Sequence, residues 1–264
     1  GKAMKGKNWR EYEPPKRRRR RRKGGLLRKL RFAVVLFLVG YVGFLVYYNF
    51  GKPYTVALDA GHGGADVGAE GVIQEVALTE QTVAALQTLL EEDGRFCVVL
   101  SRKAGEGATV TERNHKFRRR HPDLMLSVHG NASDSSSANG FECYPSPPGY
   151  ENHEESLAFA ACLAQEMQNI GANLRGTGIA GVRYGYYDEN GNKLLRDSSD
   201  TTVYSYDTFG MLKNMSCPAV LAEQCFITNA SDVESFGTEE GCKRAAEAYY
   251  RAICGYLESA DSRG

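Results

Sequence analysis

Apolar residues recur along this chain at two alternating spacings, one typical of strands and the other typical of helices. Short apolar runs of strand type occupy residues 54–58, 96–100, 124–129, 140–144 and 218–225. Apolar residues at near-helical spacing occupy residues 75–93, 110–120, 155–170 and 240–257. Because strand and helix alternate, we expect a single α/β domain with a twisted, mostly parallel sheet and helices on both faces.

Residues 176–208 interrupt this alternation. The segment is rich in Tyr, Asp and Gly, and its apolar residues show little periodicity. We therefore expect an ordered but irregular excursion there.

An uncharged stretch covers residues 32–48 and precedes the α/β pattern. As a helix it would be about 25 Å long, slightly less than the hydrocarbon core of a membrane. Tyr47, Tyr48 and Phe50 stand at its end, where amphipathic rings favour a membrane interface. A cleaved signal peptide is the alternative, but the stretch does not end in small residues of the A-x-A type. We therefore expect one uncleaved transmembrane helix over residues 32–50.

Basic residues crowd into the segment before this stretch, as Lys16, Arg17 to Arg22, Lys23, Arg28, Lys29 and Arg31. The whole chain is nearly neutral, with 33 Lys and Arg against 32 Asp and Glu, so the part after Gly51 is net acidic. Positive charge beside a membrane span places the N-terminus in the cytoplasm and the following domain outside. This role in topology explains the arginine run better than a nucleic-acid site does, and we expect no nucleic-acid partner.

These patterns divide the chain into five parts. The first, residues 1–31, is expected to be a disordered basic cytoplasmic tail because it is polar and Arg-rich. The others are the anchor at 32–50, a short linker at 51–53, the folded domain at 54–258 and a tail at 259–264. The linker is so short that we expect the domain to lie close to the membrane.

Seven cysteines are scattered along the chain at positions 97, 143, 162, 217, 225, 242 and 254. They form no C-x-x-C pair, and an odd number outside the cytoplasm does not indicate a disulfide framework. Most stand in apolar runs, so we expect them to be small core residues.

Three polar residues, His62, His129 and Glu223, stand at or just past the ends of predicted strands. In open α/β sheets ligands bind at the carboxyl ends of the strands. A hydrolytic zinc site needs three protein ligands and an open position for water, and the two histidines supply two of the ligands. Glu75, at the start of a helix, is the natural third ligand. Spacing alone leaves Asp66 and Glu70 open as alternatives.

Glu223 lies inside an apolar strand, where a carboxylate seldom stands without a partner or a task. Beside a zinc-bound water it would act as general base and then as acid for the leaving amine. Ser127 and Cys225 are alternative nucleophiles. Ser127 lacks a G-x-S-x-G elbow, and a Cys225–His129 pair leaves the second histidine and both carboxylates unexplained.

Taken in order, these motifs resemble a known family. D-A-G-H-G-G at 59–64, a downstream Glu, S-V-H-G-N-A at 127–132 and P-A-V-L-A-E-x-x-F-I-T-N at 218–229 are similar to motifs of the zinc-dependent N-acetylmuramoyl-L-alanine amidases, which hydrolyse bacterial peptidoglycan. The resemblance runs from about Tyr54 to Leu257. It implies that 54–258 is a zinc amidase domain.

In this family the matching positions hold one Zn²⁺, which implies that His62, Glu75 and His129 are the metal ligands here. The resemblance also makes Glu223 the catalytic residue, and we expect Asn131 and Arg175 to contact substrate. Two departures concern the substrate groove, namely Cys225 where the family has Gly and a longer segment from Tyr184 to Asp207.

The expected protein is thus a membrane-anchored enzyme that cleaves the amide bond between N-acetylmuramic acid and L-alanine. A zinc peptidase that cuts within the stem peptide and a non-catalytic wall-binding module are the alternatives. The expected partners are peptidoglycan and the membrane, and protein partners are left open.

Overall fold

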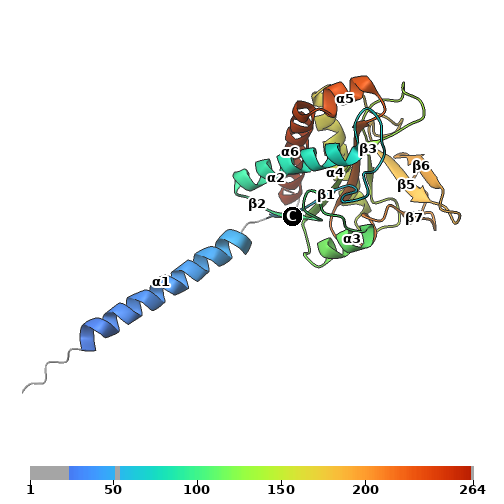
Figure 1. The fold of residues 1–264 in the computed structure, drawn as a ribbon. Coiled ribbons are helices and arrows are strands. Elements are labelled where there is room, and N and C mark those ends of the chain that lie inside the picture. Colours follow the sequence, from blue (N-terminus) through green and yellow to red (C-terminus); the bar gives the residue numbers. More distant parts are fainter. Residues whose placement is uncertain (1–23, 51–53, 263–264) are drawn as a thin grey trace, which may run out of the picture. The chain divides into compact units, whose positions relative to one another are not determined.

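The computed structural model describes residues 24–50 and 54–262, which form two units divided between Tyr48 and Asn49. The second unit is built on a five-stranded sheet in the order β2-β1-β3-β8-β4 (Figure 1). Its parallel strands are β1 (Tyr54–Ala60), β2 (Phe96–Leu100), β3 (Leu124–Asn131) and β8 (Ala219–Phe226). The edge strand β4 (Glu142–Pro145) runs antiparallel to β8. The predicted mostly parallel sheet is confirmed.

Apolar side chains alternate between the two faces of this sheet. On one face, Val56 and Leu58 join a large cluster with the buried sides of α2 (Glu75–Asp93), α4 (His153–Asn169) and α6 (Glu239–Asp261). On the other face, Ala57 packs in a second cluster with Phe117 of α3 (Val110–Arg118). Removal of both faces from water is the main favourable term for this layered fold. The expected helices on both faces are present.

Polar caps fix where several helices begin. Thr109 and Glu112 form a capping box at the start of α3, and the Thr238 hydroxyl accepts a hydrogen bond from Gly241 N at the start of α6. Asn229 caps α5 (Ala230–Phe236), a helix too short for its apolar spacing to be read from the sequence. Helix α6 continues past its predicted end at residue 257, so part of the predicted tail at 259–264 is helical.

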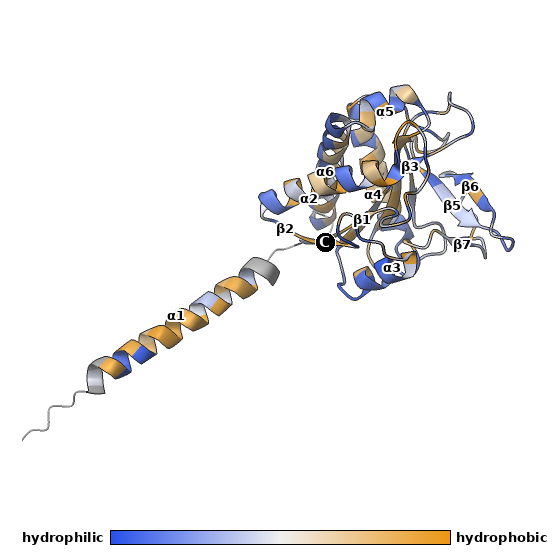
Figure 2. Cartoon of the chain, viewed as in Figure 1, coloured by the Kyte–Doolittle hydropathy of each residue, from blue (hydrophilic) through white to orange (hydrophobic). Residues whose placement is uncertain are grey.

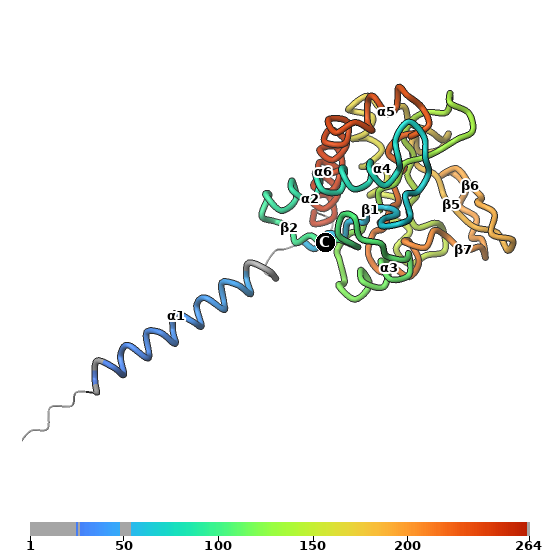
Figure 3. The backbone as a smooth tube through the Cα atoms, viewed as in Figure 1, coloured from blue at the N-terminus to red at the C-terminus, as the bar shows by residue number. Residues whose placement is uncertain are grey.

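The segment 176–208 differs from its prediction, because it contains a small antiparallel sheet instead of irregular structure. Strands β5 (Arg183–Tyr187), β6 (Lys193–Asp197) and β7 (Asp207–Thr208) pair in the order β6-β5-β7. Gly185 interrupts the apolar pattern by which β5 could be recognised as a strand. Glycine is needed at this position because a side chain would overlap the Phe209 ring that packs against it. Figure 3 shows this hairpin, in orange, beside the main sheet.

The described part of the N-terminal unit is helical and belongs to α1 (Gly24–Phe50), which ends two residues past the division between the units. It begins before its predicted start, and residues 24–31, expected to be disordered, are helical because Leu, Lys and Arg are strong helix formers. Residues Leu27–Tyr47 are long and apolar enough to cross a membrane, a property that N-terminal signal sequences share. Figure 2 shows their largely hydrophobic colouring. The rest of the predicted basic tail (1–23), the linker (51–53) and residues 263–264 lie outside the described residues.

Candidate metal centre and active site

His62 lies in the Gly-rich turn that follows β1. Its φ is +64°, in the left-handed region that few residues other than glycine adopt. Gly61 approaches the His129 ring so closely that a Cβ at this position would overlap it. Backbone in such a conformation persists only where its surroundings hold it, and it is frequent at functional sites. The turn brings the His62 and His129 rings to a centroid distance of 5.2 Å.

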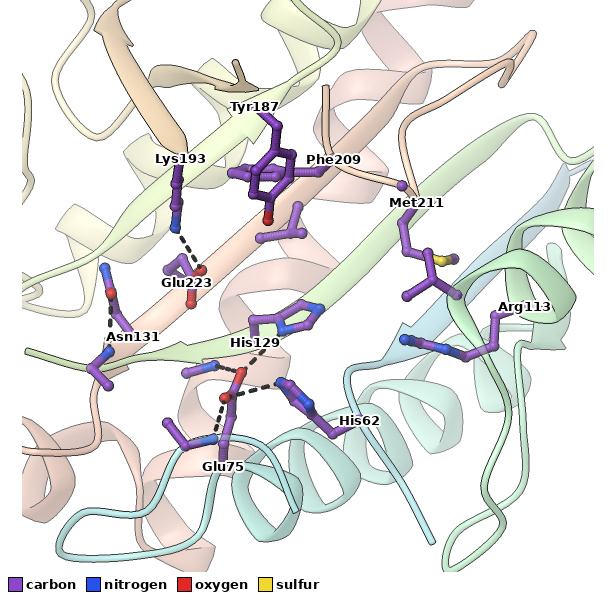
Figure 4. A pocket seen from close by; sticks show the side chains of 16 residues that line it. His62, Glu75, Arg113, His129, Asn131, Tyr187, Lys193, Phe209, Met211 and Glu223 are labelled. Carbon is purple, nitrogen blue, oxygen red and sulfur yellow. Dashed lines mark hydrogen bonds and ion pairs between the residues drawn. The ribbon is translucent and has the colours of Figure 1, made fainter. Parts of the chain in front are cut away.

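Glu75 is the first residue of α2, and its carboxylate lies between the two imidazoles (Figure 4). Its Oε2 is 3.0 Å from His62 Nε2, and its Oε1 is 3.0 Å from His129 Nδ1. The backbone N–H groups of Ala69 and Gly130 also donate to it. Burial raises the pKa of Glu75, but hydrogen bonds with His129 and His62 outweigh it and bring the pKa below its usual range. The hydrogen bond with Glu75 raises the pKa of His62 to about 8.

The geometry of these three side chains fits a metal ion. One nitrogen of each histidine and one oxygen of Glu75 all lie within 4.8 Å of one another. Two imidazoles and a carboxylate are a donor set of catalytic zinc sites, and three protein ligands leave a coordination position open. The residues present therefore fit Zn²⁺, and their assignment as its ligands stays a prediction.

The alternative carboxylates of the same loop have other partners. Asp66 Oδ2 lies 3.0 Å from His62 Nδ1, so Asp66 orients the ring with Nε2 toward Glu75. Glu70 Oε1 accepts a hydrogen bond from Gln74 Nε2 at 3.0 Å. Of the three carboxylates that spacing left open, Glu75 is the one whose oxygens reach both histidines.

Glu223 lies on β8, paired in register with His129 of β3. Its side chain is buried, its Oε1 is 3.9 Å from Lys193 Nζ, and its Oε2 has no hydrogen-bond partner among the described residues. Burial raises the pKa of Glu223, and the positive charges of His129 and Lys193 offset part of this rise. A carboxylate oxygen without a partner beside a candidate metal site is suited to accept a proton from water.

One pocket of about 380 Å³ is lined by the four residues of the candidate site, His62, Glu75, His129 and Glu223. On one side lies the His62, Glu75 and His129 cluster, with Glu223 above it (Figure 4). Tyr187 and Lys193 of the small sheet, with Phe209 after β7, form the opposite wall. Sequence reasoning missed Tyr187 and Lys193 because they belong to the segment whose strands were not recognised.

Asn131 and Arg175, the two predicted substrate contacts, both bind Glu142. Asn131 Nδ2 donates to Glu142 Oε1 at 2.6 Å, and Arg175 Nε donates to Oε2 at 3.2 Å. Tyr144 and Arg183 also donate to this buried carboxylate. Asn131 lines the pocket, whereas Arg175 is not among the lining residues. Contact of either residue with substrate stays a prediction. Glu142 was missed because a single carboxylate in a short strand gives no spacing signal.

The alternative nucleophiles lie in unsuitable surroundings. Ser127 Oγ donates to Asp59 Oδ2 at 2.6 Å, and Asp59 is also paired with Arg113 Nη1 at 2.6 Å, so the hydroxyl belongs to a buried structural network. Cys225 is fully buried, and burial raises the pKa of its thiol well above the usual range. A buried neutral thiol is a poor nucleophile. Cys225 and the other six cysteines, all of them described residues, form no disulfide bond.

Comparison with known proteins places this site in a family. The family model described as N-acetylmuramoyl-L-alanine amidase matches residues 56–255, a range that includes His62, Glu75, His129 and Glu223. This chain belongs to the N-acetylmuramoyl-L-alanine amidase family. The family predicted from the sequence motifs is therefore confirmed, and the chain is a member of a hydrolase family that acts on peptidoglycan.

Relatives of this amidase-family chain are recognisable along most of its length. It is 31% identical over 204 residues to the N-acetylmuramoyl-L-alanine amidase LytC of Bacillus subtilis (strain 168), covering 76% of this chain and 35% of LytC. It is 32% identical over 205 residues to the uncharacterized protein YqiI of the same strain, covering 77% and 85% of the two chains. The match thus spans about a third of LytC.

A solved structure supports the fold. The catalytic domain of CwlV, an N-acetylmuramoyl-L-alanine amidase from Bacillus (Paenibacillus) polymyxa var. colistinus, superposes with a TM-score of 0.62 at 24% identity. The superposition covers 78% of this chain and 98% of that domain. The predicted amidase fold is thereby confirmed.

Proposed function

We propose that this chain hydrolyses the amide bond between the lactyl group of N-acetylmuramic acid and L-alanine in peptidoglycan. The observation that carries the proposal is the convergence of His62, Glu75 and His129 within 4.8 Å at one edge of the sheet, with the buried Glu223 beside them. Membership of the amidase family supports this substrate class. The domain that performs the reaction is residues 54–258.

One Zn²⁺ ion would be held by His62, Glu75 and His129. When bound, this ion would act as a Lewis acid that polarises the scissile carbonyl group and lowers the pKa of a water molecule. Glu223 takes the proton of the attacking water at its unpaired Oε2. It then gives this proton to the nitrogen of L-alanine as the C–N bond breaks. The hydroxyl group of the water thereby ends in the new lactyl carboxyl group, and its proton ends on the released amine.

Neighbouring groups of the chain prepare these residues for their tasks. Asp66 holds His62 in the orientation that turns Nε2 to the centre of the site. The network around Glu142 fixes Asn131 at the pocket rim, where its backbone and side chain are placed to meet the substrate. Glu75 and Glu223 are both buried, so their electrostatic interactions are stronger than they would be in bulk water.

Digestion of purified peptidoglycan with the full chain, solubilised in detergent, tests this function. We expect mass spectrometry to detect stem peptides with a free N-terminal L-alanine and glycan strands without peptide. A new amine on an internal residue of the stem would identify a zinc peptidase instead. Binding without any new product would identify a wall-binding module.

We further propose that α1 anchors the chain with its N-terminus in the cytoplasm and its amidase domain outside. The apolar length of Leu27–Tyr47 and the basic residues before it support this topology. External protease is expected to remove the domain from intact cells and to leave the basic tail protected. Protection of the domain in sealed cells would overturn the topology, and a chain that begins after the apolar stretch would reveal a cleaved signal.

A further inference from the structure

Lys193 reaches the candidate active site from the small three-stranded sheet β6-β5-β7. It is the first residue of β6 and pairs in register with Tyr187 of β5. Side chains alternate along β6: Leu195, two residues on, packs on the apolar cluster beneath the sheet. Arg196 belongs to the opposite face and contacts Tyr204 and Asp200. The strand therefore presents Lys193 to the pocket and Arg196 away from it.

Two aromatic rings hold the Lys193 ammonium in place. Its Nζ lies 5.3 Å from the centroid of Tyr144 and 5.1 Å from that of Phe209, within the range of cation–π attraction. The two rings meet edge to face with their centroids 5.1 Å apart. Phe209 is fixed in turn by its close packing on Gly185. A flexible lysine is thus restricted to a small region beside Glu223.

Among the described residues, His129 and Lys193 favour the charge of Glu223, and His129 is a candidate metal ligand. Across the β4–β8 pair Glu223 stands opposite a second carboxylate, Glu142. Two guanidinium groups form ion pairs with other carboxylates: Arg113 pairs with Asp59, and Arg183 pairs with Glu142. Lys193 Nζ lies 3.9 Å from Glu223 Oε1, the oxygen that faces it in Figure 4.

We propose that Lys193 is a positioning residue for the catalytic carboxylate. Its ammonium attracts Oε1 of Glu223 and so leaves the buried Oε2 without a hydrogen-bond partner among the described residues. The 3.9 Å separation exceeds that of a charge-assisted hydrogen bond, so Lys193 orients the carboxylate by attraction and leaves it free to take up and release a proton. This inference rests on the proposed function, in which Glu223 is the general base.

The test compares Lys193→Met with Lys193→Arg and with Arg196→Met, which removes a cation from the other face of the same strand. Each full chain, in detergent, is assayed on a soluble N-acetylmuramoyl-L-alanyl peptide. We expect Lys193→Met to lower kcat by on the order of 10- to 100-fold with KM unchanged, the effect of a misplaced catalytic group. Arg196→Met should keep the wild-type kcat, and Lys193→Arg should recover most of it. Zinc content and thermal unfolding should match the wild type in all three variants.

A double-mutant cycle decides whether Lys193 acts through Glu223. In a Glu223→Gln background, Lys193→Met is expected to cause no further loss of the residual rate, because the group it positions is already inactive. Equal losses in both backgrounds would overturn the proposal, as would an unchanged kcat or a raised KM at constant kcat, which marks a substrate contact. If Lys193→Met does not fold, Lys193→Gln in the same cycle gives the answer. A wild-type chain that releases no L-alanine amine would overturn the proposed function itself.

Discussion

Replacement of His62 or His129 with alanine is expected to remove zinc and hydrolysis together. Either change leaves two protein ligands, too few for tight zinc binding. Loss of a residue that only hydrogen-bonds a metal ligand lowers zinc affinity by roughly 10- to 100-fold. Loss of a ligand itself should lower it by more. Glu75→Gln should weaken zinc affinity and activity in parallel. Asp66→Asn should have the smaller, supporting effect, because its carboxylate contacts His62 at the far nitrogen, Nδ1, and otherwise accepts a hydrogen bond from Gly68 N. Elemental analysis and rates on the soluble substrate measure both properties.

Glu70→Gln is the matched control for these variants. Glu70 lies in the same loop and carries the same charge as Glu75, but its contact is with Gln74 instead of the histidines. It should keep its zinc and its rate. Full zinc occupancy in both histidine variants would refute the ligand assignment, and loss of zinc from Glu70→Gln would move the third ligand from Glu75 to Glu70.

Glu223→Gln is expected to retain zinc and lose most of the activity. Glutamine keeps the shape of the side chain but cannot accept a proton, so the rate should fall by on the order of 10² to 10⁴, the usual contribution of a general base. Because Glu223 is buried, the neutral substitution should not destabilise the fold, and thermal unfolding provides that check. Zinc content is measured on the same samples.

Zinc content and rate together distinguish Glu75 from Glu223: replacement of Glu75 should lower both, and replacement of Glu223 should lower the rate alone. Loss of zinc from Glu223→Gln would make Glu223 a ligand. Near-full activity with zinc bound would remove it from the reaction. Either result would also remove the basis for the role of Lys193, whereas a failure confined to Lys193 leaves the assignment of Glu223 intact.

Much of the fold follows from local sequence patterns. The strands that carry His129 and Glu223 are continuous apolar runs, and such runs bounded by polar ends are typical of buried parallel strands. Because parallel strands end at one edge of a sheet, alternation of strand and helix was enough to predict that His62, His129 and Glu223 would meet. These inferences need only the period of each segment and the direction of the chain.

Such patterns could not decide which of Asp66, Glu70 and Glu75 is the third metal ligand. All three lie in or just after one Gly-rich loop, and their distances from the histidines depend on backbone angles, such as the left-handed φ of His62, that spacing does not determine. Only the folded loop turns Asp66 to the outer nitrogen of His62 and Glu75 to the inner one.

The pocket wall was likewise decided by tertiary structure. The apolar sequence pattern of β5 is broken by Gly185, whose role appears only when the Phe209 ring packs on it, and Lys193 looks in the sequence like any surface lysine. Its approach to Glu223 depends on pairing between β5 and β6 and on rings from two distant segments. The sequence by itself determined the sheet and the residues at its strand ends, because those follow from local periodicity, and the resemblance of its motifs indicated the family. The partners of each charged group were set by long-range packing, which brings together residues that no local pattern relates.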